Sequence, residues 1–500
     1  MSITGPGSIT AANVMAQTNM MNQLNTLGQE LSSGEVAQTY SGLGSQAGVA
    51  VALGAQLSAL NGYSNAASTV GTTLSVAQSV LTQLGAAGSA VQQAVSQQNS
   101  TSFDSTGQTS TQETAASYLD QIFSLLNTQV GDNYIFSGSA VNQPAVASTN
   151  EILNGNGAQA GLTQLIAERQ QADLGSNGLG RLTVGGTGSN MTLSQDGTPF
   201  GFQLTSVNST LTGASVSGPA GTPPTISISL GSNPNPGDTV QFNLTLPDGS
   251  SQIISLQATT DSPPGAGQFT IGSSTTATAA NLQTALTGSI TNLAQTALPA
   301  ASAIAAASGF FGSDPPQIVA GPPYVTATAL TSGTPANTVF WYTGENGSTP
   351  ALQTATAQVG PSMTIAYGMR ATEPAITSLV ANVAALAATT FSASNPDAQQ
   401  AYQALSQSVL ANLSGQSGTQ SIDDIEANIA NAQTTITNAS NLNTKTQATL
   451  QDMLQNMEGA NTTQIGEDIL TLQNNLSASM SVTARLAQLS LVNYLAPSSG

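Results

Sequence analysis

Three carboxylates close together are the strongest candidates for chemistry in this sequence. Asp423, Asp424 and Glu426 fall within four residues, and clustered carboxylates can bind a divalent cation. The same residues lie in the first turn of a predicted helix, where the helix dipole favours negative charge. Ser421 and Asp424 also have the S-x-x-D spacing of a capping box. We therefore expect a helix start here and not a metal site.

Three further stretches could suggest a ligand site. Asp248-Gly249 lacks the spaced acidic ligands of a calcium loop, so we expect a hairpin turn. The segment GSNPNPGDT (231–239) lacks the lysine that follows a phosphate-binding loop and is expected to be a loop. Trp341 in TVFWYTGEN could form a sugar-binding platform, but no cluster of charged residues accompanies it. We expect Trp341 to be a core residue.

The composition removes most catalytic chemistry. The chain has no His and no Cys, which are the commonest general base and the commonest thiolate ligand. Carboxylate pairs can catalyse hydrolysis, but no spacing here nominates one. We expect no catalytic residue, no cofactor and no metal, and we do not expect an enzyme.

The charge balance argues against nucleic acid and membranes as partners. Lys and Arg number five, and the net charge is −19. Binding to phosphates or anionic lipids depends on Lys and Arg. The N-terminus, MSITGPGSIT, lacks the basic and apolar regions of a signal peptide. We found no run of about 18 apolar residues and predict no membrane insertion.

Proline divides the sequence into helical arms and a different middle. Of the 22 prolines, all but Pro6, Pro396 and Pro497 lie between Pro144 and Pro374. Because proline disrupts helix interiors, residues 7–143 and 397–496 are free to form long helices. The middle, 183–370, has alternating stretches such as Val240, Phe242, Leu244 and one helical pattern at 282–293. It is expected to form one or two β-rich or α+β lobes.

Both arms carry a heptad stripe. Steps of three and four predict two coiled-coil helices that pack on each other and bring the two ends of the chain together. Asn443 and Thr446 are polar positions in this stripe and can fix its register. The predicted seam consists of Leu60, Val70, Leu74, Leu81, Leu84, Ile422, Ile425, Ile429, Ile436, Leu450 and Met453.

The extreme ends carry a second pair of apolar helices. The closing stretch, SVTARLAQLSLVNYL (481–495), is apolar on more than one face, and such a helix needs more than one neighbour. We expect it to pack on an N-terminal helix and on other copies of the chain. The predicted assembly residues are Met20, Leu24, Leu27, Leu31, Leu476, Val482, Leu486, Leu489, Leu491, Val492 and Leu495.

Several stretches resemble the bacterial flagellins, including the related hook–filament junction protein (hook-associated protein 3). The segment LSSGEVAQTYSGLGSQAGVA and the long helix after it are similar to the N-terminal signature of that family, and SMSVTARLAQLSLVNYL is similar to its closing helix. GDNYIFSGSAVNQPA (131–145) resembles the turn after the third helix of the junction protein and of alphaproteobacterial flagellins, although Tyr134 and Phe136 could equally serve a local core. ILNGNGAQAGLTQLIAERQQADLGSNGLGRL resembles flagellins of the rhizobial and methylotroph type.

The resemblance implies a mainly α-helical, elongated, multi-domain protein with a β-rich variable middle. Residues 1–40 and 460–500 would form an inner terminal-helix domain, residues 41–182 and 375–459 a helical shell, and residues 183–374 the outer region. Such proteins are secreted by type III export without a cleaved signal and form an extracellular helical homopolymer, the flagellum, for motility. Implied partners are other copies, the export apparatus, an export chaperone, the filament cap and hook-associated proteins.

The sequence departs from the family pattern in its charges. Glu35 stands where family members place a basic residue after the LSSG turn, and neutral residues around Gly54 replace the usual arginine. We expect subunit contacts that use apolar and amide groups and are insensitive to salt. The junction protein and a secreted adhesin remain alternative functions.

Overall fold

The chain divides into two units, each built from separate stretches of sequence. The computed structural model describes residues 6–494 apart from 38, 98–101, 198, 393, 416 and 417, without the side chains of 6–10 and 486–494. Unit 1 comprises Met1–Thr69, Gln358–Thr364 and Thr435–Gly500, and unit 2 comprises Val70–Ala357 and Ile365–Thr434.

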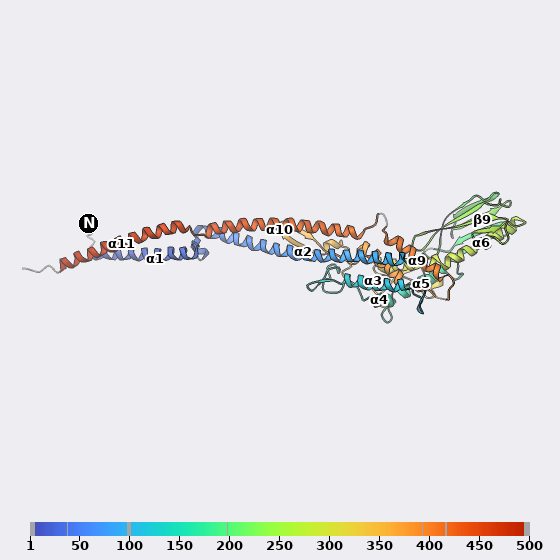
Figure 1. The fold of residues 1–500 in the computed structure, drawn as a ribbon, viewed down its shortest axis with the longest axis horizontal. Helices are drawn as coiled ribbons and strands as arrows, with labels where there is room; N and C mark the ends of the chain where they lie inside the picture. The colour runs from blue at the N-terminus through green and yellow to red at the C-terminus, as the bar shows by residue number, and fades with distance from the viewer. Residues whose placement is uncertain are drawn as a thin grey trace, which may run out of the picture. The chain divides into compact units, whose positions relative to one another are not determined.

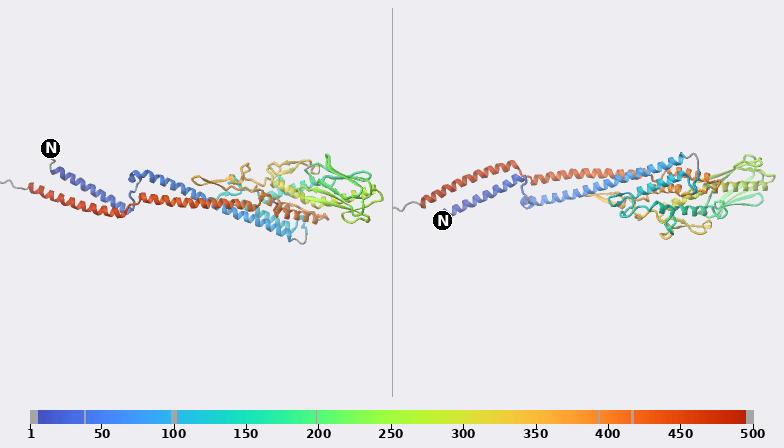
Figure 2. Two further views of the ribbon diagram at one scale, coloured as in Figure 1. Left: turned by 90° about the horizontal axis from the view of Figure 1, so that it is seen from above. Right: turned by 60° about the horizontal axis from the view of Figure 1, so that its bottom comes forward.

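Unit 1 is built on helices from both ends of the chain. It contains α1 (Pro6–Ser33), the 3₁₀ turn η1 (Tyr40–Gln46), the first part of α2 (Ala47–Ser96), the last part of α10 (Ile422–Glu458) and α11 (Thr462–Tyr494). α1 and α11 lie side by side (Figures 1 and 2). The Val36 amide donates to the Glu458 carbonyl at 2.7 Å, and the Ala460 amide donates to Gly34 at 2.9 Å. The two helix-to-helix connections are therefore bonded to each other.

The predicted seam residues are mostly buried. Leu60, Val70, Leu74, Leu81, Leu84, Ile425, Ile429, Ile436 and Leu450 are all buried, and Ile422 is half-buried. Met453 is the exception, because it is 48% exposed while Leu454 is half-buried. Likewise, Gln447 is half-buried, whereas Thr446, the predicted seam residue beside it, is exposed. A straight helix drifts relative to a strict heptad, so the buried stripe moves by one position towards the end of α10.

Asn443 is buried, but its hydrogen bond differs from the one expected of a seam residue. Its amide donates to the backbone carbonyl of Val359 at 2.9 Å. Val359 belongs to β13 (Thr356–Gly360), which pairs with β14 (Met363–Ala366) as a two-stranded sheet. Asn443 therefore fixes this small sheet onto α10.

One helical stretch has the length and composition of a membrane span. Within Tyr40–Ser96, an 18-residue window has a mean hydropathy of 1.3, which the sequence analysis did not anticipate. Length and composition are weak evidence for a single helix. Within the described residues, 11% of that window is buried, so the protein itself covers little of it.

Unit 2 contains a helical body. Its helices are α3 (Ser110–Leu126), α4 (Thr149–Asn154), α5 (Leu162–Leu174), α7 (Ala297–Phe311), α8 (Pro374–Ala388) and α9 (Ala398–Leu413). α7 contacts α5, α8 and α9, and α8 also packs on α3. Short pieces complete this body, namely β1 (Gln129–Val130), β2 (Asn133–Tyr134), β11 (Gln317–Val319), η2 (Tyr324–Thr326), β12 (Leu330–Ser332) and η3 (Ala351–Thr354). The side chains of α7 are mostly alanine and other apolar groups on every face of the helix, so α7 can lie buried among other helices.

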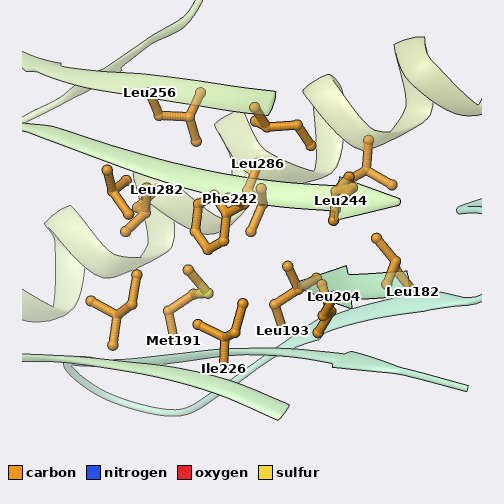
Figure 3. Close-up of a cluster of buried hydrophobic side chains, with 14 of the residues drawn as sticks. Leu182, Met191, Leu193, Leu204, Ile226, Phe242, Leu244, Leu256, Leu282 and Leu286 are labelled. Carbon is orange, nitrogen blue, oxygen red and sulfur yellow. The ribbon is translucent and has the colours of Figure 1, made fainter. Parts of the chain in front are cut away.

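A β lobe forms the rest of unit 2. One sheet has the order β3-β4-β7-β6 and the other the order β10-β9-β8-β5. The strands are β3 (Leu182–Gly185), β4 (Asn190–Gln195), β5 (Gln203–Ser209), β6 (Ala214–Ala220), β7 (Thr225–Leu230), β8 (Thr239–Thr245), β9 (Ser251–Thr259) and β10 (Gln268–Thr270). Both sheets and α6 (Thr275–Gln295) enclose one apolar core, which includes Phe242, Leu282 and Met191 (Figure 3). The expected β-rich middle is therefore present, with α6 as the predicted helix.

Two of the five basic residues are buried where the lobe joins the helical body. Arg169 donates to Asp173 at 2.8 Å, and Arg181 donates to the carbonyls of Ala172 and Ala327 at 2.7 and 2.8 Å. Both guanidinium groups lie over the Phe200 ring, at 5.1 and 5.5 Å from its centroid. Burial raises the pKa of the Asp173 carboxyl, and the Arg169 charge opposes that rise.

The lobe core gives a first prediction. Replacing Phe242 by Ala should lower the free energy of unfolding of the lobe by about 3–5 kcal/mol, because it leaves a cavity among fully buried side chains. Gln241→Ala, at the exposed neighbouring position of β8, should change it by less than about 0.5 kcal/mol. Urea unfolding followed by circular dichroism measures both variants, and equal losses would contradict this assignment of the core.

The buried ion pair gives a second prediction. Arg169→Met should destabilise the helical body by about 3–5 kcal/mol, because it leaves the Asp173 carboxylate buried without its partner. Adding Asp173→Asn should recover more than half of that loss, since the amide oxygen can still accept from the Gly201 amide. Fluorescence of Trp341, the only tryptophan, reports the unfolding. No recovery in the double variant would show that the arginine acts by packing and not by charge.

Candidate assembly surface

The acidic cluster serves to start a helix. The Asp424 carboxylate accepts from the Ser421 amide and hydroxyl, both at 2.8 Å, and the Asp424 amide donates to the Ser421 hydroxyl. These hydrogen bonds from Ser421 hold the pKa of Asp424 below its usual value. Glu426 accepts from Thr82 at 3.0 Å. The predicted capping box is confirmed.

The other candidates for chemistry also have structural roles. Asp248-Gly249 forms the turn between β8 and β9, with the Leu246 amide donating to Ser250 at 2.8 Å. Trp341 is buried and donates from its indole nitrogen to the Phe311 carbonyl at 3.2 Å. Phe136 in the YIFSGS turn is fully buried. Among the residues with described side chains, no group of three or more His, Cys, Asp or Glu residues lies close enough together to bind a metal ion.

One cavity in unit 2 collects polar groups. It has a volume of about 410 Å³ and is lined in part by Asp314, Tyr342 and Arg370. The Arg370 guanidinium pairs with the Glu345 carboxylate and donates to the Thr349 carbonyl. Burial raises the pKa of the Tyr342 hydroxyl, so this phenol stays protonated at neutral pH. The polar lining of this cavity therefore includes a phenol, an arginine paired with a carboxylate, and the carboxyl group of Asp314.

The terminal helices present a different kind of surface. On α1, half-buried side chains recur at Asn13, Gln17, Met20, Leu24 and Leu27. On α11, they recur at Ile469, Leu472, Leu476, Ser479 and Thr483, after the buried Ile465. The Gln17 amide donates to the Ser479 and Thr483 hydroxyls at 3.3 and 3.1 Å. These two stripes face each other, and polar contacts replace apolar ones towards the chain ends.

The contact between α1 and α11 has almost no core within one copy of the chain. Of the side chains described in these two helices, Ile465 alone is buried, at 6% exposure. The others that face the partner helix are half-buried. A helix pair that buries so little apolar area contributes little stability of its own.

The predicted assembly residues fall into three groups. Met20, Leu24, Leu27 and Leu476 lie half-buried on the facing stripes. Leu31 and Val482 are exposed, at 43% and 52%. Leu495 lies outside the described residues, and so do the side chains of Leu486, Leu489, Leu491 and Val492, although α11 extends to Tyr494.

Further apolar side chains on these helices point to solvent and were not singled out from the sequence. They are Val14, Met15 and Met21 on α1 and Leu470 on α11, each at least 45% exposed. They lie off the heptad stripe, so the signal for them was an apolar residue at a position where a solvated helix would be polar. A groove of about 470 Å³ between Thr26 and Leu27 of α1 and Asp468, Thr471 and Leu472 of α11 lies on the same pair.

The contacts described within unit 1 are formed mainly by uncharged groups. The three ion pairs found in the part of the chain that the structure describes all join residues of unit 2. Glu35, the unusual acidic residue after the LSSG turn, forms a backbone bridge with Gly459. Lys445 and Arg485 are the cations of unit 1 and are both exposed.

Comparison with known proteins agrees with the pattern of the N-terminal arm. Residues 8–141 match the family model of the bacterial flagellin N-terminal helical region. No curated protein matches the chain. The matched range includes α1, α2 and α3 and ends within the YIFSGS turn region. Over its N-terminal helical region, residues 8–141, the chain is therefore similar to the bacterial flagellins.

Proposed function

We propose that this chain is the structural subunit of a flagellar filament, the flagellin itself, and that it polymerises through α1 and α11. The observation that carries the proposal is the helix pair with one buried side chain and several exposed apolar ones. Exposed apolar patches on a protein surface commonly mark protein–protein contacts. Neighbouring copies of the same helices would supply the missing burial.

The proposed organisation has three regions. Residues 1–40 and 460–500 would form the inner domain, residues 41–182 and 375–459 the shell, and residues 183–374 the outer region. Antiparallel pairing of α2 and α10 as a coiled coil is supported by two hydrogen bonds between them. Gln447 donates to Asn61 at 3.2 Å in unit 1, and Thr82 donates to Glu426 at 3.0 Å in unit 2.

The proposal extends to where the subunit works and with what. The similarity to flagellins implies an extracellular filament for motility and export by the type III route without a cleaved signal. It also implies contacts with an export chaperone, the filament cap and hook-associated proteins. We propose no enzymatic role for this chain.

Two alternatives predict different behaviour. As a hook–filament junction protein of the hook-associated protein 3 kind, the chain would be present in sheared filaments only in traces, whereas a flagellin would be their main component. As a secreted adhesin, it would keep binding its target after removal of residues 481–500, whereas a filament subunit would lose assembly. Mass spectrometry of sheared filaments and electron microscopy of the truncated chain distinguish these functions.

The exposed face of the helix pair gives a third prediction. Met15→Asp and Val482→Asp should each abolish polymerisation of the purified chain, because each buries a charge at a contact between copies. Asn19→Asp and Ser477→Asp place the same charge at exposed polar positions of the same helices and serve as matched controls. Electron microscopy measures filament formation, and urea unfolding of the lobe checks that each variant is folded. Filaments of normal length from Val482→Asp would contradict the proposed interface.

The scarcity of ion pairs in unit 1 gives a fourth prediction. Filaments should keep their length between low and moderate salt, since contacts without ion pairs are not weakened by screening. Sedimentation of filaments at a series of salt concentrations measures this. Dissociation at moderate salt would indicate ionic contacts between copies.

A further inference from the structure

Methionine is distributed unevenly between the two units. The chain has ten methionines, and all except Met191 and Met369 belong to unit 1. Those two are buried, at 0% and 5% exposure. On the terminal helices, by contrast, Met15 and Met21 of α1 are 72% and 45% exposed, and Met480 of α11 is 51% exposed. Exposed methionines therefore occur on the helices through which we propose that the chain polymerises.

The three exposed methionines of α1 and α11 lie close together along the helix pair. The Gln17 amide donates to the hydroxyls of Ser479 and Thr483 at 3.3 and 3.1 Å, so Gln17 lies at the same level as residues 479–483 of α11. Because a helix rises about 1.5 Å per residue, all three methionines fall within about 6 Å of this level along the helix axis. They form one group on the surface of the helix pair.

The composition makes methionine the side chain most open to oxidation. The chain has no Cys and no His, and its only tryptophan, Trp341, is 3% exposed. Oxidation of methionine to the sulfoxide replaces a flexible apolar group by a polar one and disrupts contacts that depend on methionine. An exposed thioether on an assembly surface is therefore a point where an oxidant can act on assembly.

We propose that Met15, Met21 and Met480 form an oxidation site that controls polymerisation. Hydrogen peroxide transfers one oxygen atom to each thioether sulfur, its O–O bond breaks, and water leaves, so that the sulfur is oxidised and the peroxide is reduced. Methionine sulfoxide reductases reverse the step, because their thiols are oxidised to a disulfide while the sulfoxide oxygen leaves as water. Unit 2 stays folded during this treatment, since its two methionines are buried.

The control of assembly rests on the proposed filament, in which other copies cover this surface. A sulfoxide oxygen that is buried at an apolar contact loses its hydrogen bonds to water, which is unfavourable. The exposed neighbours Val14 and Val482 have apolar side chains and cannot replace those hydrogen bonds. In the polymer, the same cover would shield the sulfurs from peroxide. Oxidation would thus act on free subunits and spare finished filaments.

A map of sulfoxides in the full-length chain tests the site. Free chain and polymer are treated with hydrogen peroxide, digested and analysed by mass spectrometry. In the free chain, Met15, Met21 and Met480 should oxidise at least about tenfold faster than Met191 and Met369, because exposed thioethers react first. In the polymer, the rates of the first three should fall about tenfold. Equal rates at Met480 and Met191 in the free chain would overturn the proposal, and so would equal rates at Met480 in the two states.

Polymerisation after oxidation tests the control of assembly. Peroxide treatment of the free chain should lower the polymerised fraction about tenfold, and reductase treatment should restore it. The chain with Met15→Leu, Met21→Leu and Met480→Leu should lose less than about half of its own untreated polymerised fraction, because leucine has a similar volume and no sulfur. Met191→Leu is the matched control and should lose as much as the natural chain.

The outcomes separate this proposal from the filament function. Equal losses in the triple leucine chain and the natural chain would overturn the proposal, and so would an oxidised natural chain that polymerises normally. If the leucine chain does not polymerise even untreated, the reductase experiment on the natural chain decides, and no recovery counts against the proposal. An untreated natural chain without filaments would contradict the filament function, whereas the sulfoxide map of the free chain measures the site without polymerisation.

Discussion

The contact between α1 and α11 joins residues that are very distant in sequence, since Gln17 bonds to side chains 462 and 466 positions away. Closing so long a loop costs conformational entropy, and the contact returns little, because Ile465 is its one buried side chain among those described. Each helix also carries exposed apolar residues on other faces. From this imbalance we infer that the terminal helices obtain further burial from other copies of the chain.

Unit 2 differs from the pair of terminal helices, because its apolar cores are closed within one copy of the chain. The lobe core is closed between two sheets and α6, and most of α7 is buried against α5, α8, α9 and β11. Three of the five basic residues lie in unit 2, and each of them forms an ion pair with a carboxylate. This distribution places ionic interactions inside a stable unit and leaves apolar and amide groups on the helices that we propose to meet other copies.

The elements with a clear period could be predicted from the sequence. Alternation identified β4, β7, β8 and β9, and heptad spacing identified α2 and α10, with a drift of one position that placed Leu454 where Met453 was expected. Helix α7 was missed because it is apolar all round and shows no amphipathic period, whereas α8 lies in the stretch 375–459 that was predicted to be helical. β6 was missed because it contains Gly218 and Pro219, which an edge strand tolerates. The segment TVFWYTG makes only isolated bridges, since Trp341 and Tyr342 are both buried and do not alternate.

The assembly residues could be predicted only in part. Met20, Leu24, Leu27 and Leu476 follow the stripe that faces the partner helix, which a sequence period can reveal. Val14, Met15 and Leu470 lie outside any period, and their significance depends on knowing that they are more than half exposed in the described structure.

Hydrogen exchange of the monomer and the polymer tests the central claim most directly. If the terminal helices lack a core of their own, the amides of α1 and α11 should exchange rapidly in the monomer and become protected in the polymer, while those of β8 and α7 are protected in both. Strong protection of α1 and α11 in the monomer would contradict the account, because it would mean that one copy of the chain suffices to stabilise them.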